Sequence, residues 1–275
     1  MSEPAAPPSL DPYAPKEIAV RVETVGVGKA NQAFLPTLML AVLAGAFIAF
    51  GGAFYTLVMT GSGLGFGPAR LLGGAAFSLG LILVIVGGAE LFTGNNLIAM
   101  AWADGKVTHG QMLRNWLIVY AGNFVGAVGT ALLIAASGVL GLGDGAVAET
   151  AVAIAEGKLA LSTFEAFVRG VLCNVLVCLA VWLCFAARSV SGKILSIVFP
   201  ISAFVALGFE HSIANMYLIP IARFAGAEQV SAAGFLANLV PVTLGNIIGG
   251  SVLVALVYWV IYLRRPATGE SAGPS

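Results

Sequence analysis

Long apolar runs, separated by short polar or glycine-rich stretches, set the pattern of this sequence. No charged residue lies between Lys29 and Arg70, and about 20 consecutive apolar residues are enough for one helix to cross a bilayer. The pattern predicts six crossings, at residues 36–59, 71–103, 116–137, 163–187, 194–222 and 236–263. A less hydrophobic linker at residues 138–161 joins the first three crossings to the last three.

The second and fifth runs contain polar residues in their middle. The second run is roughly a dozen residues longer than one crossing requires, so we expect a break at residues 93–96, where Gly94 and Asn95 supply a turn. The fifth run is expected to break at residues 210–215. Irregular backbone at this depth is tolerated only where protein or a water-filled cavity surrounds it.

The two breaks are copies of one another. The residues that recur after 120 positions are Gly88, Glu90 and Asn95, as Gly208, Glu210 and Asn215; those that recur after 123 are Gly122, Asn123 and Gly126, as Gly245, Asn246 and Gly249. Small residues within such helices predict close packing. A duplication with interrupted helices is typical of transporters and channels, and three helices per half make the halves inverted. The predicted fold is therefore an all-α integral membrane protein with an inverted 3+3 repeat.

Composition agrees with a membrane protein and excludes several other classes. Apolar residues make up 59% of the 275 residues and charged ones 9%, whereas about one quarter of a soluble protein is charged. A net charge of zero without a basic run argues against a nucleic-acid partner. Three cysteines and two histidines have no spacing typical of a metal or redox site, and no cofactor motif is present, so we expect neither metal nor cofactor.

The distribution of lysine and arginine predicts the orientation. Six crossings place both termini on one side, and with the termini inside nine basic residues face the cytoplasm and four the other side. We expect residues 1–32 to be a cytoplasmic tail with a short amphipathic helix, residues 33–265 to be the transmembrane domain, and residues 266–275 to be a second cytoplasmic tail of a protein in the inner or plasma membrane.

The strongest candidate site lies in residues 208–220. Glu210, His211 and Asn215 are polar groups within sequence apolar enough for a bilayer, and ionisable residues kept at that depth usually line a pathway or hold an ion. The alternative is structural: Glu210 and Asn215 would satisfy backbone groups freed by a helix break, with His211 packed against them. The second copy of the pattern favours the pathway.

From Lys29 to Arg264 the sequence closely resembles the formate/nitrite transporter family. The motifs that carry the resemblance are FSLGL at 77–81, ELFTG at 90–94, GN at 122–123, LCN at 172–174, GFEHSIANM at 208–216 and PVTLGN at 241–246. The resemblance implies a homopentamer in which each protomer has its own aquaporin-like pore, with the second and fifth helices broken.

The resemblance also implies roles for individual residues. His211 would lie at the pore centre, Thr93 on the loop that interrupts the second helix, Asn174 beside the histidine, Glu210 against the fifth-helix break, and Lys158 before the fourth helix. Glu90, Gly94, Asn95 and Asn215 would form the helix breaks. Two apolar constrictions are implied, although ordinary core packing is the alternative for each member: Phe77, Leu81 and Phe204 in one, and Leu91, Phe92 and Val177 in the other.

The expected function is transport of small monovalent weak-acid anions, formate above all, with a proton supplied at the central histidine. Nitrite or hydrosulfide is the alternative within this class. A neutral-solute pore fits the fold but not Lys158, Glu210 and His211. An intramembrane hydrolase would need a serine near His211; Ser212 is adjacent in sequence, and adjacent helical side chains diverge. The protein is therefore not expected to be an enzyme.

Overall fold

Helices make up most of the described chain in this computed structural model, which describes residues 11–264. The tail expected at residues 266–275 lies outside that range. Five helices are long and apolar enough to cross a membrane, and a sixth apolar helix, α9, is shorter. Their bounds are α2 Phe34–Met59, α3 Phe66–Gly87, α6 His109–Ala136, α8 Thr163–Ala186, α9 Val190–Ala206 and the continuous helix Ala232–Tyr262.

The remaining helices are shorter and lie around these. The continuous helix consists of α12 Ala232–Ile247, a π-helical segment η3 Ile248–Leu256 and α13 Val257–Tyr262. The others are α1 Pro15–Asn31, α4 Phe92–Asn95, η1 Asn96–Ile98, α5 Ala99–Ala103, η2 Val139–Gly141, α7 Ala146–Leu159, α10 Ser212–Leu218 and α11 Pro220–Phe224. The linker expected at residues 138–161 is thus mostly the helix α7.

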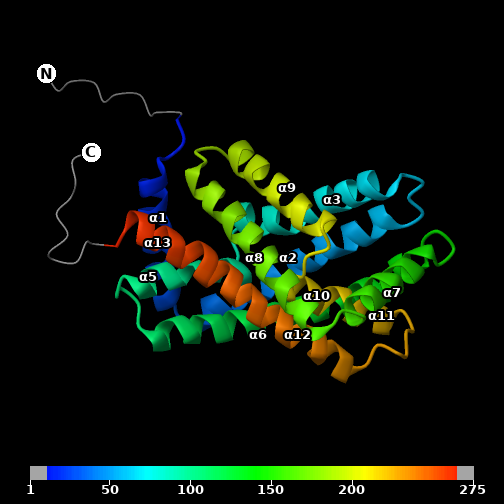
Figure 1. Cartoon of the computed structure of the whole chain (residues 1–275). Helices are drawn as coiled ribbons and strands as arrows, with labels where there is room; N and C mark the ends of the chain where they lie inside the picture. Colours follow the sequence, from blue (N-terminus) through cyan, green and yellow to red (C-terminus); the bar gives the residue numbers. More distant parts are fainter. Residues whose placement is uncertain (1–10, 265–275) are drawn as a thin grey trace, which may run out of the picture.

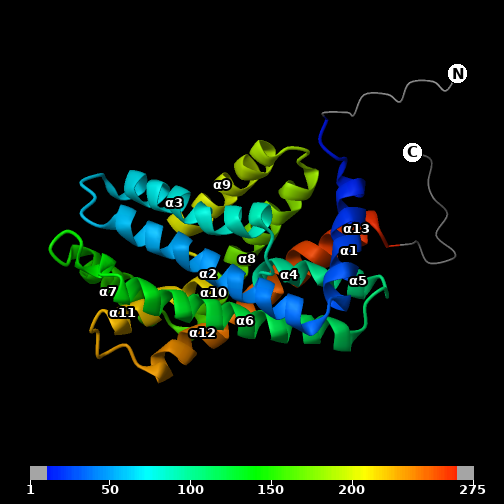
Figure 2. The ribbon, with the colours of Figure 1, turned by 180° about the vertical axis from the view of Figure 1, so that it is seen from behind.

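The long helices run between two ends of the molecule. Figure 1 and the reverse view in Figure 2 agree that α1, α5 and α13 gather at one end and that α7 and α11 gather at the other. The described chain begins and finishes at the α1 end (Figure 1). This arrangement gives the molecule a long axis, with α1 and α5 at one extremity and α7 and α11 at the other.

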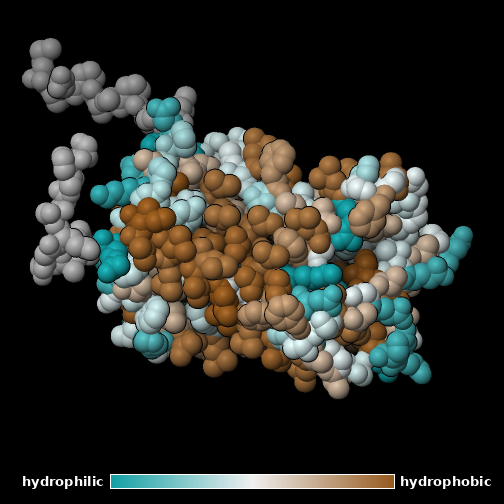
Figure 3. Space-filling view, viewed as in Figure 1, coloured by the Kyte–Doolittle hydropathy of each residue, from teal (hydrophilic) through white to brown (hydrophobic). Residues whose placement is uncertain are grey.

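The surface between the two ends is apolar. Figure 3 shows hydrophobic residues across the middle of one face and hydrophilic residues concentrated toward both ends. Large side chains such as Phe164, Phe199 and Leu133 are exposed by 75%, 74% and 72%. An apolar surface of this kind is unfavourable in water, so the protein is a membrane protein.

Two glycines end α3 and α9 in the same way. Gly88 and Gly208 have φ angles of +84° and +72°, which glycine adopts without steric cost. The following amides, of Ala89 and Phe209, donate to the carbonyls of Val84 and Phe204, at 2.9 and 3.0 Å. Each pair forms the hydrogen bond that closes a helix C-terminus around a left-handed glycine.

These glycines place the first interruption earlier than the sequence predicts. The non-helical residues are 88–91, whereas Thr93 and Asn95 lie within α4, so the break expected at residues 93–96 is wrong. In the fifth run α9 ends at Ala206 and α10 begins at Ser212. Glu210 therefore lies in that interruption, but Asn215 lies in a helix.

The repeated glycines lie at close helix contacts. A Cβ on Gly126 of α6 would overlap the carbonyl oxygen of Val42 on α2. A Cβ on Gly249 of η3 would overlap the carbonyl oxygen of Val171 on α8 in the same way. The close packing predicted for these glycines is confirmed.

Candidate functional site

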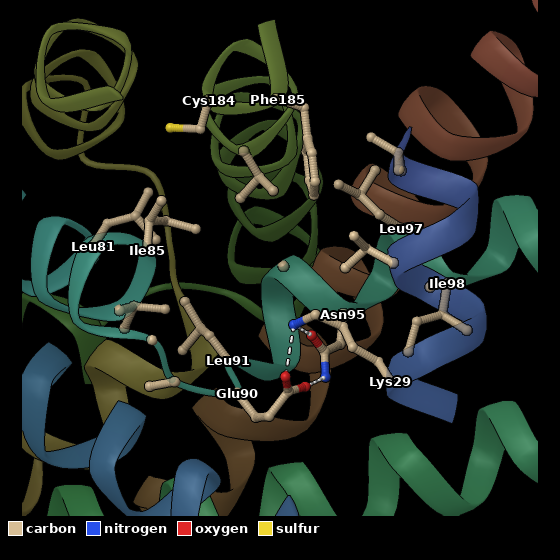
Figure 4. A pocket seen from close by; sticks show the side chains of 18 of the residues that line it. Lys29, Leu81, Ile85, Glu90, Leu91, Asn95, Leu97, Ile98, Cys184 and Phe185 are labelled. Atoms are coloured by element: carbon tan, nitrogen blue, oxygen red, sulfur yellow. Dashed lines mark hydrogen bonds and ion pairs between the residues drawn. The ribbon is translucent and has the colours of Figure 1, made fainter. Parts of the chain in front are cut away.

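A lysine, a glutamate and two asparagines anchor the first interruption. Lys29 Nζ lies 2.9 Å from Glu90 Oε1 and donates to Asn95 Oδ1 at 2.9 Å. Asn95 Nδ2 donates to Glu90 Oε2 at 2.6 Å and to Asn115 Oδ1 at 2.9 Å. Figure 4 shows Lys29, Glu90 and Asn95 turned toward one another, with Lys29 reaching in from α1. We call these four residues the Lys29 network.

The second interruption has an anchor of the same four residue types, in which Asn215 Oδ1 has no hydrogen-bond partner within residues 11–264. Lys158 Nζ of α7 donates to Glu210 Oε1 at 2.9 Å. Asn215 Nδ2 donates to Glu210 Oε2 at 2.6 Å and to Asn238 Oδ1 at 2.7 Å. Asn238 in turn donates to the Lys158 carbonyl at 3.0 Å, as Asn115 does to that of Lys29. These four residues form the Lys158 network, which satisfies both oxygens of a carboxylate that is 3% exposed.

Asn123 holds the backbone of the first interruption. Its Oδ1 accepts from the Phe92 amide at 2.9 Å, and its Nδ2 donates to the carbonyls of Ala41 and Glu90 at 2.7 and 2.9 Å. The Phe92 amide and the Glu90 carbonyl are groups that an uninterrupted helix would have paired, whereas the Ala41 carbonyl belongs to the neighbouring helix α2. Buried backbone groups of this kind are costly when unpaired, so one side chain replaces the lost helical bonds.

Asn246 does the same at the second interruption. Its Oδ1 accepts from the Ser212 amide at 2.9 Å, and its Nδ2 donates to the carbonyls of Gly170 and Glu210 at 2.8 and 3.0 Å. The two asparagines therefore make three matching bonds each. Each interruption thus has one asparagine that holds its backbone in the same way.

The two interruptions meet at a contact between Thr93 and His211. His211 caps the N-terminus of α10, where the Ala214 amide donates to its Nδ1 at 3.0 Å. Its Nε2 lies 3.0 Å from Thr93 Oγ1. Because Nδ1 accepts, a neutral ring carries its proton on Nε2 and donates it to Thr93. Both side chains are almost completely buried.

Asn174 of α8 supports Thr93 and makes no direct bond to the ring. Its Nδ2 lies 3.2 Å from the Thr93 carbonyl and 2.7 Å from both Asn96 Oδ1 and the Asn246 carbonyl. Its Oδ1 is buried and has no hydrogen-bond partner within residues 11–264. The amide thus ties the first interruption to the second from the side and leaves one acceptor free.

Two cavities approach this centre. The Lys158 cavity, of about 450 Å³, is lined by Phe77, Phe204, Glu210 and His211, among others. The Lys29 cavity, of about 400 Å³, is lined by Lys29, Leu81, Glu90 and Leu91, among others. Figure 4 shows the second cavity enclosed by α1, α3 and α8 around the Lys29 network.

The six expected constriction residues are all buried, and they differ in which cavity they line. The rings of Phe77 and Phe204 are 5.7 Å apart, and Phe204 stacks 5.9 Å from His211. Leu81 lines the Lys29 cavity with Leu91, not the cavity of the two phenylalanines. Phe92 and Val177 line neither of these two cavities.

A further charged cluster attaches α1 to its surroundings. Lys106 bonds Glu23 of α1 and lies 3.1 Å from Asp104, which accepts from Trp259 Nε1 at 3.0 Å. Burial raises the pKa of the Glu23 carboxyl, and the bond to Glu23 raises the pKa of Lys106. Burial also acts to raise the pKa of Asp104, but the hydrogen bonds from Trp259 and Lys106 outweigh it and lower that pKa.

Several residues of these networks are absent from the sequence-based candidates. They are Lys29, Asn115, Asn123, Asn238 and Asn246. A signal for most of them exists, because Asn115 and Asn238 are separated by 123 positions, as Asn123 and Asn246 are. Lys29 lies near the end of α1 and Lys158 near the end of α7. Only the structure places the two lysines in equivalent positions.

Comparison with known proteins decides the family. The profile of the family described as "Formate/nitrite transporter" matches residues 16–260. The chain belongs to the formate/nitrite transporter family. The resemblance drawn from the sequence motifs is thereby confirmed, and the family consists of channels and transporters.

Individual members are similar over most of their length. The formate channel FocA of Escherichia coli K12 is 45% identical over 275 aligned residues, which cover 93% of this chain and 96% of that protein. The structure titled "Pentameric formate channel with formate bound" has a TM-score of 0.78 and 41% identity, covering 84% of this chain and 98% of the other. An "FNT family ion channel" has a TM-score of 0.81 and 32% identity, covering 89% and 98%.

Proposed function

We propose that this protein carries formate across the membrane through a pore within each protomer, past the contact between Thr93 and His211. The observation that carries the proposal is a lysine-containing cavity that reaches the buried imidazole of His211, which contacts Thr93, together with a second lysine-containing cavity lined by Gly94 next to Thr93. The names of the similar proteins, formate channel FocA and pentameric formate channel, support the substrate and a homopentamer.

The proposed topology is the inverted 3+3 repeat of six crossings. Two of the crossings are broken, one made of α3, α4, η1 and α5 and the other of α9, α10 and α11. Matching hydrogen bonds at the two interruptions support a duplication, and the shared location of the two described ends supports an even number of crossings. The basic residues then place the α1 end in the cytoplasm of a cell bounded by this inner or plasma membrane. The Lys29 cavity is the inner vestibule and the Lys158 cavity the outer one.

The two lysines make each vestibule favourable for an anion, although each is partly neutralised by its glutamate. Beyond them, the buried rings of Phe77 and Phe204 on one side and Leu81 and Leu91 on the other leave little room for water. A bare carboxylate is costly in such surroundings. Formate therefore needs either a strong hydrogen-bond donor or a proton in order to pass.

His211 supplies that donor. Its Nε2–H turns from Thr93 to a carboxylate oxygen of formate, and Thr93 Oγ1 follows as a second donor. If formate takes up a proton, the neutral acid crosses the apolar rings. That proton comes from the water of the vestibule, because Nδ1 accepts from the Ala214 amide and removal of the single proton on Nε2 would leave an imidazolate. Anions of strong acids do not accept the proton and should pass more slowly.

The test is flux into proteoliposomes that contain the purified protein. Formate, nitrite and chloride are compared at pH 5.5 and 7.5, values chosen on either side of the ordinary pKa of histidine, about 6.5. We expect formate to enter fastest and to enter faster at the lower pH. Absence of formate flux above that of empty vesicles contradicts the proposal.

The alternatives are separated by the same preparation. Nitrite or hydrosulfide in place of formate would appear as a faster flux of those anions. A neutral-solute pore would swell vesicles with glycerol as fast as with formate. A serine hydrolase receives little support, because both ring nitrogens of His211 are engaged by other groups and Ser212 Oγ has no hydrogen-bond partner in the described chain.

A further inference from the structure

Two arginines converge at the edge of the Lys158 cavity. Arg70 reaches it from α3 and Arg169 from α8, and both line the cavity together with Lys158. A Cβ built on Gly208 would lie 3.1 Å from Arg70 Nη2 and 3.7 Å from Arg169 Nη1. Both guanidinium groups are thus within contact distance of one small backbone position, where glycine leaves them room.

Neither arginine is neutralised by a carboxylate in direct contact. Within residues 11–264, neither makes an ion pair within 4 Å. Glu165, one turn before Arg169 on α8, interacts with it electrostatically from an exposed position. Two like charges held close together repel one another, and an anion between them relieves that repulsion.

Both guanidinium groups keep free donors. Arg70 uses Nε for the Ala206 carbonyl at 2.7 Å and Nη2 for the Val205 carbonyl at 2.9 Å. Arg169 uses Nη1 for the Gly208 carbonyl at 3.4 Å. Since a guanidinium has five N–H donors, most remain for a ligand, and the backbone bonds fix the directions in which they point. Guanidinium groups match carboxylates in charge and geometry.

The arrangement occurs in one half of the molecule only. The Glu210 amide donates to the Arg169 carbonyl, and the Glu90 amide donates to the Leu40 carbonyl, both at 3.2 Å. Leu40 therefore occupies the position of Arg169 in the other half. The Lys158 cavity is lined by three cations and Glu210, whereas the Lys29 cavity is lined by Lys29, Lys193 and Glu90.

We propose that Arg70 and Arg169 form a carboxylate-binding subsite in the Lys158 cavity, at which formate docks before it reaches Lys158 and His211. The inference rests on the proposed function, and it adds a binding step on the Lys158 side of the protein. Because the other face has Leu40 in the equivalent position, entry of formate saturates at a lower concentration from the Lys158 side than from the Lys29 side.

The experiment measures initial formate influx in right-side-out and inside-out membrane vesicles from cells that produce the protein. Loss of Arg70 also removes two bonds at the end of α9, so the first variant is Arg169→Gln. We expect it to raise the half-saturating formate concentration about threefold to tenfold on the Lys158 side, as removal of one nearby charge predicts. The maximal flux and the half-saturation from the other side should stay within about twofold.

Two further variants separate binding from structure. Arg169→Lys keeps the charge, so its half-saturating formate concentration should return most of the way to that of the unmodified protein. Arg114→Gln is the matched control, because Arg114 also donates to a backbone carbonyl, that of Gln32 at 3.2 Å, but at the α1 end. It should leave half-saturation on the Lys158 side unchanged.

The outcomes are distinct. If Arg169→Gln has an unchanged half-saturating formate concentration and a normal maximal flux, the proposed subsite is wrong and the proposed function still holds. A fall in maximal flux alone also overturns it, because that result assigns Arg169 to structure. If the unmodified protein carries no formate, the proposed function fails first and the formate subsite fails with it.

Discussion

The two helix interruptions have the same frame and different centres. Glu90 and Glu210, Asn95 and Asn215, and Asn123 and Asn246 make matching bonds within a few tenths of an ångström. The residue that precedes the restarted helix is Leu91 in one half and His211 in the other. The same frame therefore holds a leucine in one half and, in the other, a histidine that also caps α10 through its Nδ1.

The same contrast holds for the residues around the ring. The hydrogen bonds of Asn123 and Asn246 pair Ala41 with Gly170, which makes Gly45 the counterpart of Asn174 on the matching helix. Thr93 has Ile213 as its counterpart. Between the two matching interruptions, therefore, positions at which the residues agree identify the scaffold, and positions at which they differ identify the candidates for chemistry.

The largest expected effect is on the shared frame. Gly126→Ala and Gly249→Ala should each prevent recovery of folded protein, because the added Cβ overlaps a carbonyl oxygen of the neighbouring helix. The yield of monodisperse protein after detergent extraction measures this. Gly129→Ala on the same helix α6 is the control, since its Cβ meets open space; it should be neutral or stabilising by up to about 1 kcal/mol. Equal yields for Gly126→Ala and Gly129→Ala would contradict the expectation.

The next effect concerns the differing centre. His211→Asn keeps a side chain able to cap the Ala214 amide but removes the Nε2–H. We expect normal assembly and a fall in formate flux of about tenfold, which corresponds to the loss of one hydrogen bond to a charged group. The rise in flux between pH 7.5 and 5.5 should also weaken. Leu91→Met, at the equivalent position, should retain both properties; unaltered flux and pH response in His211→Asn count against the role of His211.

A smaller effect is expected at the two lysines, where the halves agree. Lys158→Met and Lys29→Met should each reduce formate flux severalfold by removing an attractive charge and leaving a buried glutamate unpaired. The double variant Lys158→Met/Glu210→Gln removes the unpaired charge and separates the two causes. Flux at low formate concentration measures the effect, and indifference to Lys158→Met would reduce that residue to a structural partner of Glu210.

The smallest effect is expected at the Lys106 cluster. Lys106 has a raised pKa in the folded protein, so its contribution to stability is complete below its ordinary value of 10.5 and is lost as the pH rises through the folded value. Its side chain is 51% exposed, which limits the contribution to less than about 1 kcal/mol. Lys106→Met should lower the thermal unfolding midpoint slightly at pH 7, and the difference should shrink above about pH 11. A constant difference across pH would contradict the assignment.

At acidic pH the contribution of Asp104 to the same cluster changes in the opposite direction, because there it falls as the pH is lowered. Asp104 has a lowered pKa, so its contribution is present above 3.8 and is lost as the pH falls below that value. Glu23 has a raised pKa, and protonation at low pH favours the folded state at that residue. The two carboxyls therefore offset one another, and Asp104→Asn should remove part of the acid sensitivity.

Much of the fold could be predicted from hydrophobic patterning, but the ends of α3 and α9 could not. Four long helices begin or end within a few residues of the prediction at one terminus or both. The breaks were expected at the most polar residues, whereas the helices actually end at Gly88 and Gly208. Hydropathy alone predicts a linker where the structure has the helix α7. Its buried residues Val147, Ala151 and Ala155 follow a helical period.

The candidate site was predictable in part. Glu210, His211 and Asn215 stand out because they are polar residues in an apolar segment. The contact between Thr93 and His211 joins residues 118 positions apart, and periodicity carries no information about such a pair. The role of Phe92 in a constriction stays a prediction; the structure adds that its ring packs 4.9 Å from that of Tyr120, a contact that a motif does not encode.

The hydrogen bond between Thr93 and His211 has a consequence for an unloaded protomer. The imidazole and the hydroxyl satisfy each other directly, so this point of the proposed pore does not need a bridging solvent molecule when no substrate is bound. A continuous file of water would conduct protons along its length; a self-paired threonine and histidine break that file. An idle pore of this design is expected to leak little proton current even while both vestibules remain wet.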